Sequence, residues 1–163
     1  MNNTENIGRK VWLLEDKGAY CICKKDKTYL VVAIVEPKHN LPDGSVNTDW
    51  CDHFILQRED GTLFHEREYQ CVVTPDESIK DISSRFYDCL RHNHLYPDEV
   101  YPNDDAENPE SIIVHIDWGD WKHDHGWCDV LMGYLGYTCG DEQVTDENGS
   151  DCYSSTHYYY KVA

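Results

Sequence analysis

Two regular hydrophobic patterns lie inside the most acidic part of this chain. Between residues 111 and 118, apolar residues alternate with their neighbours and so share one face of an extended strand, namely Ile112, Val114, Ile116 and Trp118. Between Asp124 and Leu135, apolar residues recur at intervals of three and four, which is typical of an amphipathic helix. A strand and a helix in direct succession need a common core. The acidic half of the chain is therefore expected to fold.

The rest of the sequence predicts mainly strands. Apolar or β-branched runs predict strands at 10–14, 19–23, 28–35, 53–58, 62–73, 142–145 and 151–162. The polar stretches 15–18 and 24–27 resemble turns, and 96–110 resembles an acidic loop.

One further helix is predicted after residue 74. Thr74 suits the N-cap position, Pro75 the first helical position, and Glu77 completes a capping box. Ile79, Ile82, Phe86 and Leu90 follow at helical spacing and predict one buried stripe.

These elements predict an α+β fold with an antiparallel or mixed β-sheet and two amphipathic helices packed on one face. At 163 residues the chain fits a single domain, 1–163. The polar stretch 37–50, which contains two prolines, is the candidate for a long loop or a seam.

Charge is distributed unevenly along the chain. Residues 97–163 contain fifteen acids and two bases, a net charge of −13, whereas residues 1–96 have a net charge of only −4. Twelve tyrosines and five tryptophans are too many for a disordered acidic protein. A one-signed field on a folded body favours a basic partner and repels nucleic acid.

Two segments in this half contain no base at all, 98–110 and 141–151. They supply eleven acids, and aromatic residues that are typical interface anchors lie beside them. The predicted partner-binding residues are Asp98, Glu99, Tyr101, Asp104, Asp105, Glu107, Glu110, Asp141, Glu142, Asp146, Glu147 and Asp151.

We therefore expect a non-enzymatic binding protein that occupies the basic, nucleic-acid-binding cleft of another protein. In size and charge the chain is similar to acidic DNA-mimic inhibitors of the anti-restriction or anti-CRISPR type, although no motif assigns it to one family. No cofactor, no direct binding to nucleic acid and no membrane association are expected. Eight cysteines without a secretion signal favour the cytoplasm.

An alternative is a metal-binding protein or metal-dependent enzyme. His115, Asp117, Asp120, His123 and His125 cluster where the predicted strand leads into the helix. Imidazole and carboxylate groups suit Zn²⁺, Mn²⁺ or Fe²⁺, but the spacing matches no established metal motif.

Other classes of function are not favoured by the sequence. No Cys-x-x-Cys pair accompanies Cys89, His92 and His94, so a structural zinc site is not expected there. The glycine-rich motifs that bind nucleotide phosphates and the nucleophile elbow are also absent.

Overall fold

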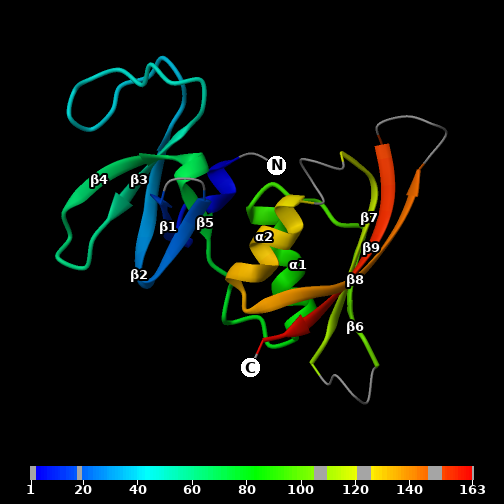
Figure 1. Ribbon diagram of the computed structural model, residues 1–163. Helices are drawn as coiled ribbons and strands as arrows, with labels where there is room; N and C mark the ends of the chain where they lie inside the picture. The colour runs from blue at the N-terminus through cyan, green and yellow to red at the C-terminus, as the bar shows by residue number, and fades with distance from the viewer. Residues whose placement is uncertain (1–2, 18–19, 105–109, 121–125, 147–151, 163) are drawn as a thin grey trace. The chain divides into compact units, whose positions relative to one another are not determined.

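The computed structural model describes residues 3–17, 20–104, 110–120, 126–146 and 152–162. Within these ranges only the backbone is described for 16–17, 20–24, 117–120, 141–146 and 152–153. Two antiparallel sheets and two α-helices confirm the predicted α+β class. The backbone forms two compact units, Met1–Thr74 and Pro75–Ala163, coloured blue to green and green to red in Figure 1. Single-domain organisation stays a prediction.

The first unit is built on a five-stranded sheet with the order β4-β3-β2-β1-β5. Its elements are η1 (Asn3–Asn6), β1 (Lys10–Lys17), β2 (Tyr20–Val35), β3 (His53–Gln57), β4 (Leu63–Arg67), η2 (Glu68–Gln70) and β5 (Cys71–Val73). All pairings are antiparallel. The core of this unit forms around Val11, Val31, Phe54, Leu56 and Val73.

The prediction of a turn at 24–27 is wrong. These residues lie inside β2, where Lys24 pairs with Leu13 of β1 beside a register shift. Backbone pairing between the two strands outweighs the polar composition. As a result, β1 extends to Lys17 and β2 begins at Tyr20. The polar stretch 37–50 lies between β2 and β3, as predicted for a loop.

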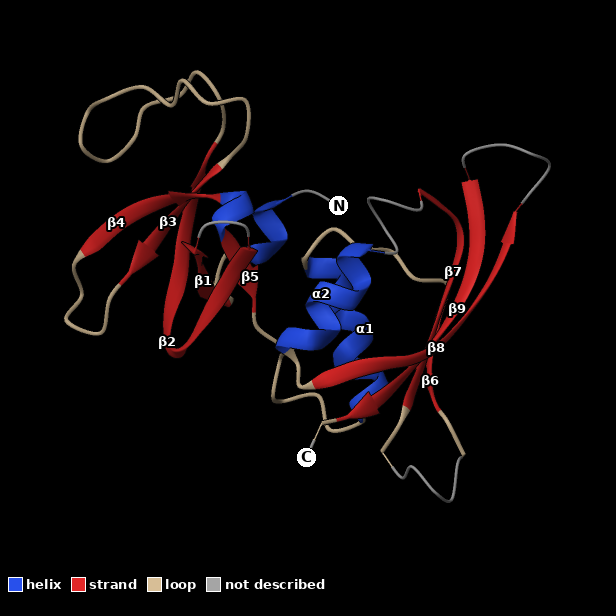
Figure 2. Ribbon diagram, viewed as in Figure 1, coloured by secondary structure: helices blue, strands red, loops and turns tan. Residues whose placement is uncertain are grey.

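The second unit is built on a four-stranded antiparallel sheet with the order β6-β7-β9-β8. Its elements are α1 (Ile82–His92), β6 (Glu99–Pro102), β7 (Ile112–Asp120), α2 (Gly126–Tyr134), β8 (Tyr137–Asp146) and β9 (Cys152–Lys161). Figure 2 shows α1 and α2 on the same side of this sheet. Ile112, Val114 and Ile116 are at most 2% exposed, which confirms their predicted face of the strand.

The first helix begins later than the sequence predicted. Thr74 is not its N-cap, because the Thr74 backbone N–H and hydroxyl both donate to the carbonyl oxygen of Lys10. Asp81 is the N-cap, and its carboxylate accepts the backbone N–H of Ser84 at 2.9 Å. Phe86 and Leu90 of the predicted stripe are buried.

Two other boundaries also differ from prediction. The segment predicted as an acidic loop contains the short strand β6, because Glu99–Pro102 pairs with β7. The long strand predicted at 62–73 is interrupted by η2. Gly136, directly before β8, has a left-handed conformation with φ of 93°, which is typical of the residue that ends a helix.

The core of the first unit predicts that the same substitution at two leucines changes the free energy of unfolding by different amounts. Leu56 is fully buried in β3, whereas Leu63 of β4 is 50% exposed. We expect Leu56→Ala to lower the free energy of unfolding by about 2–5 kcal/mol, because it leaves a cavity. Leu63→Ala is the matched control, with an expected change within about 0.5 kcal/mol. Urea unfolding measures both, and equal effects would contradict this description of the core.

Candidate functional site

The first predicted acidic segment occupies one edge of the four-stranded sheet. Asp98 and Glu99 are exposed at the start of β6, and Asp104 is exposed beyond its end. The Asp98 backbone N–H donates to the carbonyl oxygen of His115, which fixes the segment against β7. Tyr101 is 39% exposed between these acids. Asp105 and Glu107 lie outside the described residues.

The second predicted segment occupies the opposite edge. Asp141, Glu142 and Asp146 belong to β8, while Glu147 and Asp151 lie outside the described residues. The strand predicted at 142–145 therefore begins earlier, at Tyr137. Three acids of this segment are held in a paired strand.

The strand register separates the two segments. Tyr101 of β6 pairs with Ile113, Ile113 with Tyr158 of β9, and Tyr158 with Asp141 of β8. Three strand spacings of about 4.8 Å place the two edges roughly 14 Å apart. The acidic segments do not converge on one point, but they border the same sheet from both sides.

The sheet face that carries Tyr101 is the one opposite the helices. In register, Tyr101, Ile113 and Tyr158 share this face, while the alternate positions on β7 and β9 are buried on the helix side. His115 and Thr156 also pair on it, with His115 Nδ1 3.0 Å from the Thr156 hydroxyl. We call this side of the second unit, with its two acidic edge strands, the outer face.

Residues 97–163 contain little positive charge to offset these acids. Of their two bases, Lys122 lies outside the described residues, and Lys161 Nζ lies 3.2 Å from a carboxylate oxygen of Glu110. Both partners of this pair are more than half exposed, so the ion pair adds little stability. Its effect is to neutralise one of the predicted binding residues, Glu110.

The predicted His/Asp metal cluster is only partly described. His115 contacts Thr156, as noted above, and β7 carries the backbone of Asp117 and Asp120. His123 and His125 lie outside the described residues. This alternative stays a prediction.

The position of His92 at the end of α1 is explained by its contacts within the helix. His92 Nε2 lies 3.4 Å from a carboxylate oxygen of Asp88, one turn earlier. A histidine near a helix C-terminus also interacts favourably with the helix dipole. Cys89 is buried, and its thiol lies 3.7 Å from the Asn93 amide nitrogen.

Sequence reasoning missed a polar cluster on the helix side of the sheet. His157 is fully buried, with Nε2 2.7 Å from the Ser155 hydroxyl and Nδ1 3.9 Å from a carboxylate oxygen of Asp129 on α2. The Tyr159 hydroxyl donates to the same carboxylate at 2.5 Å. Cys139 of β8 completes the cluster, since one ligand atom each of Asp129, Cys139 and His157 lies within 4.8 Å of the others.

Burial governs the protonation of the cluster's neighbours. Burial, reinforced by Cys128, raises the pKa of Tyr159 well above its usual range, so this hydroxyl stays protonated and donates. Burial likewise raises the pKa of the Cys128 thiol to about 12, so Cys128 is not a thiolate at neutral pH.

The contacts from Ser155 through His157 to Asp129 follow the order of a catalytic triad, but their burial argues against one. A nucleophile must reach a substrate. Ser155 is 1% exposed and His157 is fully buried. The cluster is therefore not a hydrolase site.

A β-bulge places Cys139 next to His157. The pairing of β8 with β9 shifts between Cys139 and Asp141, which leaves Gly140 as the extra residue. A Cβ atom on Gly140 would lie 1.9 Å from the Tyr160 ring. A larger residue at the bulge position would therefore force the Tyr160 ring to move.

The first unit contains a second polar network. His53 Nε2 lies 2.6 Å from an Asp49 carboxylate oxygen, which also accepts from Arg67 at 2.9 Å. His53 Nδ1 lies 3.0 Å from His65 Nδ1. The contacts from His53 and then Arg67 lower the pKa of Asp49 below 3.8. This network ties the loop before β3 to β3 and β4.

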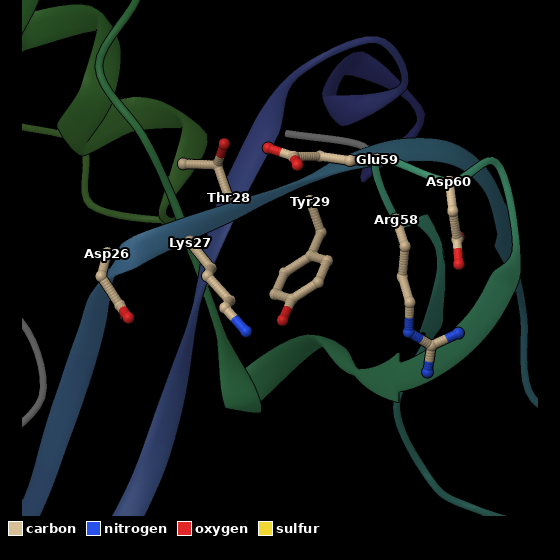
Figure 3. Close-up of a pocket in the computed structure, with 7 residues that line it drawn as sticks. All are labelled: Asp26, Lys27, Thr28, Tyr29, Arg58, Glu59 and Asp60. Carbon is tan, nitrogen blue, oxygen red and sulfur yellow. The ribbon is translucent and has the colours of Figure 1, made fainter.

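A hollow of about 560 Å³ in the first unit is lined by 26–29 of β2 and 58–60 after β3. Figure 3 shows the Tyr29 ring between Lys27 and Arg58. The Arg58 guanidinium already packs over the Phe64 ring at 4.2 Å and donates to Thr62. With both signs of charge around it, the hollow selects no class of ligand.

Comparison with known proteins adds no functional information. No family model, no curated protein and no solved structure matches the chain. Within the described residues, no helix has the length and apolar character needed to cross a membrane.

The bulge at Gly140 predicts opposite effects of one substitution at two glycines. We expect Gly140→Ala to lower the free energy of unfolding, because the new methyl group collides with Tyr160. Gly133→Ala is the matched control within α2, where a Cβ meets nothing within 4 Å. There alanine should stabilise the protein by about 0.5–1 kcal/mol. Destabilisation at both positions in urea unfolding would contradict the proposed packing.

The Asp49 network predicts a pH dependence. A carboxyl with a lowered folded pKa contributes stability above its unfolded pKa, near 3.8, and loses it as the pH falls through the folded value. We expect Asp49→Asn to lower the melting temperature at pH 7 and the difference from wild type to shrink below about pH 4. Asp26→Asn, at an exposed position, is the control. A difference that stays constant from pH 7 to pH 3 would contradict the assignment.

Proposed function

We propose that the protein is a non-enzymatic, acidic binding protein whose outer face occupies a basic cleft on a nucleic-acid-binding partner. One observation carries this proposal: acids line both edge strands of one sheet, about three strand spacings apart, in a region with few bases. The proposal places binding in the second unit.

The charges of the two units support that choice. Pro75–Ala163 contains nineteen acids and five bases, a net charge of −14, and Met1–Thr74 has a net charge of −3. A field of one sign attracts a basic surface over distances comparable to the Debye length, about 8–10 Å in physiological salt. Association is therefore steered toward the second unit.

The spacing of the acids supports a cleft built for duplex DNA. The two edges lie roughly 14 Å apart by strand spacing, and a DNA major groove is about 12 Å wide between its two phosphate strands. In the register, Glu99 of β6 and Asp141 of β8 occupy outer-face positions at the two edges, so negative charge borders this face on both sides. Such a surface competes with DNA for the same basic groups.

Aromatic side chains between the acidic edges provide binding energy that charge alone does not. Tyr101 is 39% exposed and Tyr158 is partly exposed on the outer face. Tyrosine is enriched among the residues that dominate interface energies, because it buries a large area and keeps a polar group. The proposed surface thus has an apolar centre and a charged rim.

The biological role that follows is inhibition. A protein that fills a DNA-binding cleft keeps DNA out, so the proposed target is a nuclease or another component of a host defence system. This is the mode of action of anti-restriction or anti-CRISPR inhibitors of the DNA-mimic type.

Edge acids also have a purely structural use, because charged edge strands resist pairing with other sheets. The two explanations differ in what neutralisation does. If the acids only guard the edges, neutralised variants aggregate but lose no specific binding. If they form a binding surface, the variants stay monomeric and lose the partner.

The test uses competition by DNA. A lysate fraction enriched in nucleic-acid-binding proteins by heparin chromatography is passed over the immobilised full-length chain at low salt. We expect bound proteins to be released by a short DNA duplex, and their affinity to fall about tenfold or more with rising salt. Retention that neither duplex DNA nor salt disturbs would contradict the proposal.

Two triple variants that change the net charge by the same amount then locate the binding surface. Asp98→Asn, Glu99→Gln and Asp104→Asn together remove three exposed acids from the β6 edge. We expect this triple variant to bind the captured partner about tenfold more weakly, measured by surface plasmon resonance.

The control triple variant removes three exposed acids from the first unit, Glu5→Gln, Asp26→Asn and Glu36→Gln. It changes the net charge equally and should leave the affinity within about twofold. Equal losses in both variants would mean that only the overall charge matters, and light scattering separates loss of binding from aggregation.

A further inference from the structure

We propose that Asp129, Cys139 and His157 form a binding site for one Zn²⁺ ion on the helix side of the four-stranded sheet. The three residues come from α2, β8 and β9, and one ligand atom of each lies within 4.8 Å of the others. This site lies on the opposite side of the sheet from the outer face and uses none of the residues of the His115–His125 cluster.

The distances are close to those of a zinc site. Zinc bonds of about 2.0–2.3 Å in tetrahedral geometry place neighbouring ligand atoms roughly 3.4–3.6 Å apart. Asp129 Oδ1 and His157 Nδ1 are 3.9 Å apart. A side-chain shift of about 1 Å or less therefore brings all three ligand atoms to bonding distance.

The neighbouring hydrogen bonds orient the ligands as in known metal sites. A metal-binding histidine uses its second ring nitrogen to donate to a nearby oxygen. The Ser155 hydroxyl lies 2.7 Å from His157 Nε2, so Nε2–H donating to Ser155 leaves the Nδ1 lone pair directed at Asp129. Tyr159 donates to Asp129 and holds that carboxylate in place.

The bulge at Gly140 supplies the thiol. Cys139 pairs with Tyr159 in the register, directly before the bulge, and its sulfur lies within 4.8 Å of a ligand atom of His157. Bulges commonly re-aim a side chain beside a functional site. A side chain at the extra position would displace the Tyr160 ring that lies over Gly140.

The chemistry of the ligands selects the ion. A thiolate, an imidazole and a carboxylate form the mixed set that suits zinc, whereas Mg²⁺ and Ca²⁺ prefer oxygen ligands alone. The Asp129 side chain is 44% exposed, so solvent reaches the site from that side. Three protein ligands and a water molecule in the fourth position match the pattern of an open zinc site.

The test measures metal binding by the full-length, untagged protein after treatment with a chelator. We expect one equivalent of Zn²⁺ by isothermal titration calorimetry and mass spectrometry. Co²⁺, used as a spectroscopic probe, should show a thiolate charge-transfer band in the near ultraviolet. Failure to bind either ion would overturn the proposal.

Three variants assign the ligands. Cys139→Ser should abolish the charge-transfer band and weaken Zn²⁺ binding about tenfold or more, and Asp129→Asn should weaken it without abolishing the band. Ser155→Ala, which touches no metal, should lower the affinity about 10–100-fold by releasing His157. A Cys139→Ser protein that keeps the band would overturn the assignment.

The matched control removes the competing histidines. His123→Gln with His125→Gln leaves all three proposed ligands intact, so Zn²⁺ affinity should stay within about twofold of wild type. Loss of binding in this variant would move the metal to the His115–His125 cluster and overturn the proposal. Circular dichroism of each variant shows whether it retains the fold.

Discussion

The second unit depends on the central position of β9 in its sheet. This strand pairs with β7 on one side and β8 on the other, and it contributes the fully buried Tyr159 and His157 to the helix side. β9 contains no acid, whereas the other central strand, β7, contains Asp117 and Asp120. Four acids of this half lie on the edge strands, Glu99 on β6 and Asp141, Glu142 and Asp146 on β8, and others lie on β7, on α2 and between the elements. The strand order places β6 and β8 at the two edges, so their acids lie on both sides of the proposed binding surface.

The same strand makes the helix side unusually polar for a core. Burying an imidazole, a phenol and a hydroxyl is unfavourable unless each is hydrogen-bonded. Here Ser155 contacts His157, and Tyr159 donates to Asp129. Apolar residues of similar size would pack with fewer constraints, so a polar cluster at this position favours a use for its donor atoms. The zinc proposal assigns that use.

The sequence predicted the elements whose pattern is local. Ile112, Val114 and Ile116 alternate, and they share the buried face as expected. Features set by distant partners were not predictable. Thr74 has the composition of an N-cap, but hydrogen bonds to Lys10, far away in sequence, assign it to the first unit instead. Residues 24–27 are polar, yet pairing with β1 makes them part of a strand.

The candidate sites also differ in how far the sequence predicts them. The acidic segments were visible in the composition, but their position on opposite edges follows from the register of four strands. The cluster of Asp129, Cys139 and His157 left no sequence signal, since its members are spaced by ten and eighteen residues and meet through a bulge. A spacing rule cannot anticipate a single extra residue in a strand. Spatial clusters of this kind require the fold.

The central claim is that both acidic edges of one sheet contact one basic partner. Hydrogen–deuterium exchange of the full-length chain, with and without the captured partner, tests it most directly. We expect the partner to slow exchange in both β6 and β8 and to leave exchange in β4 and β5 of the first unit unchanged. Protection confined to the first unit, or to one edge of the second, would contradict it.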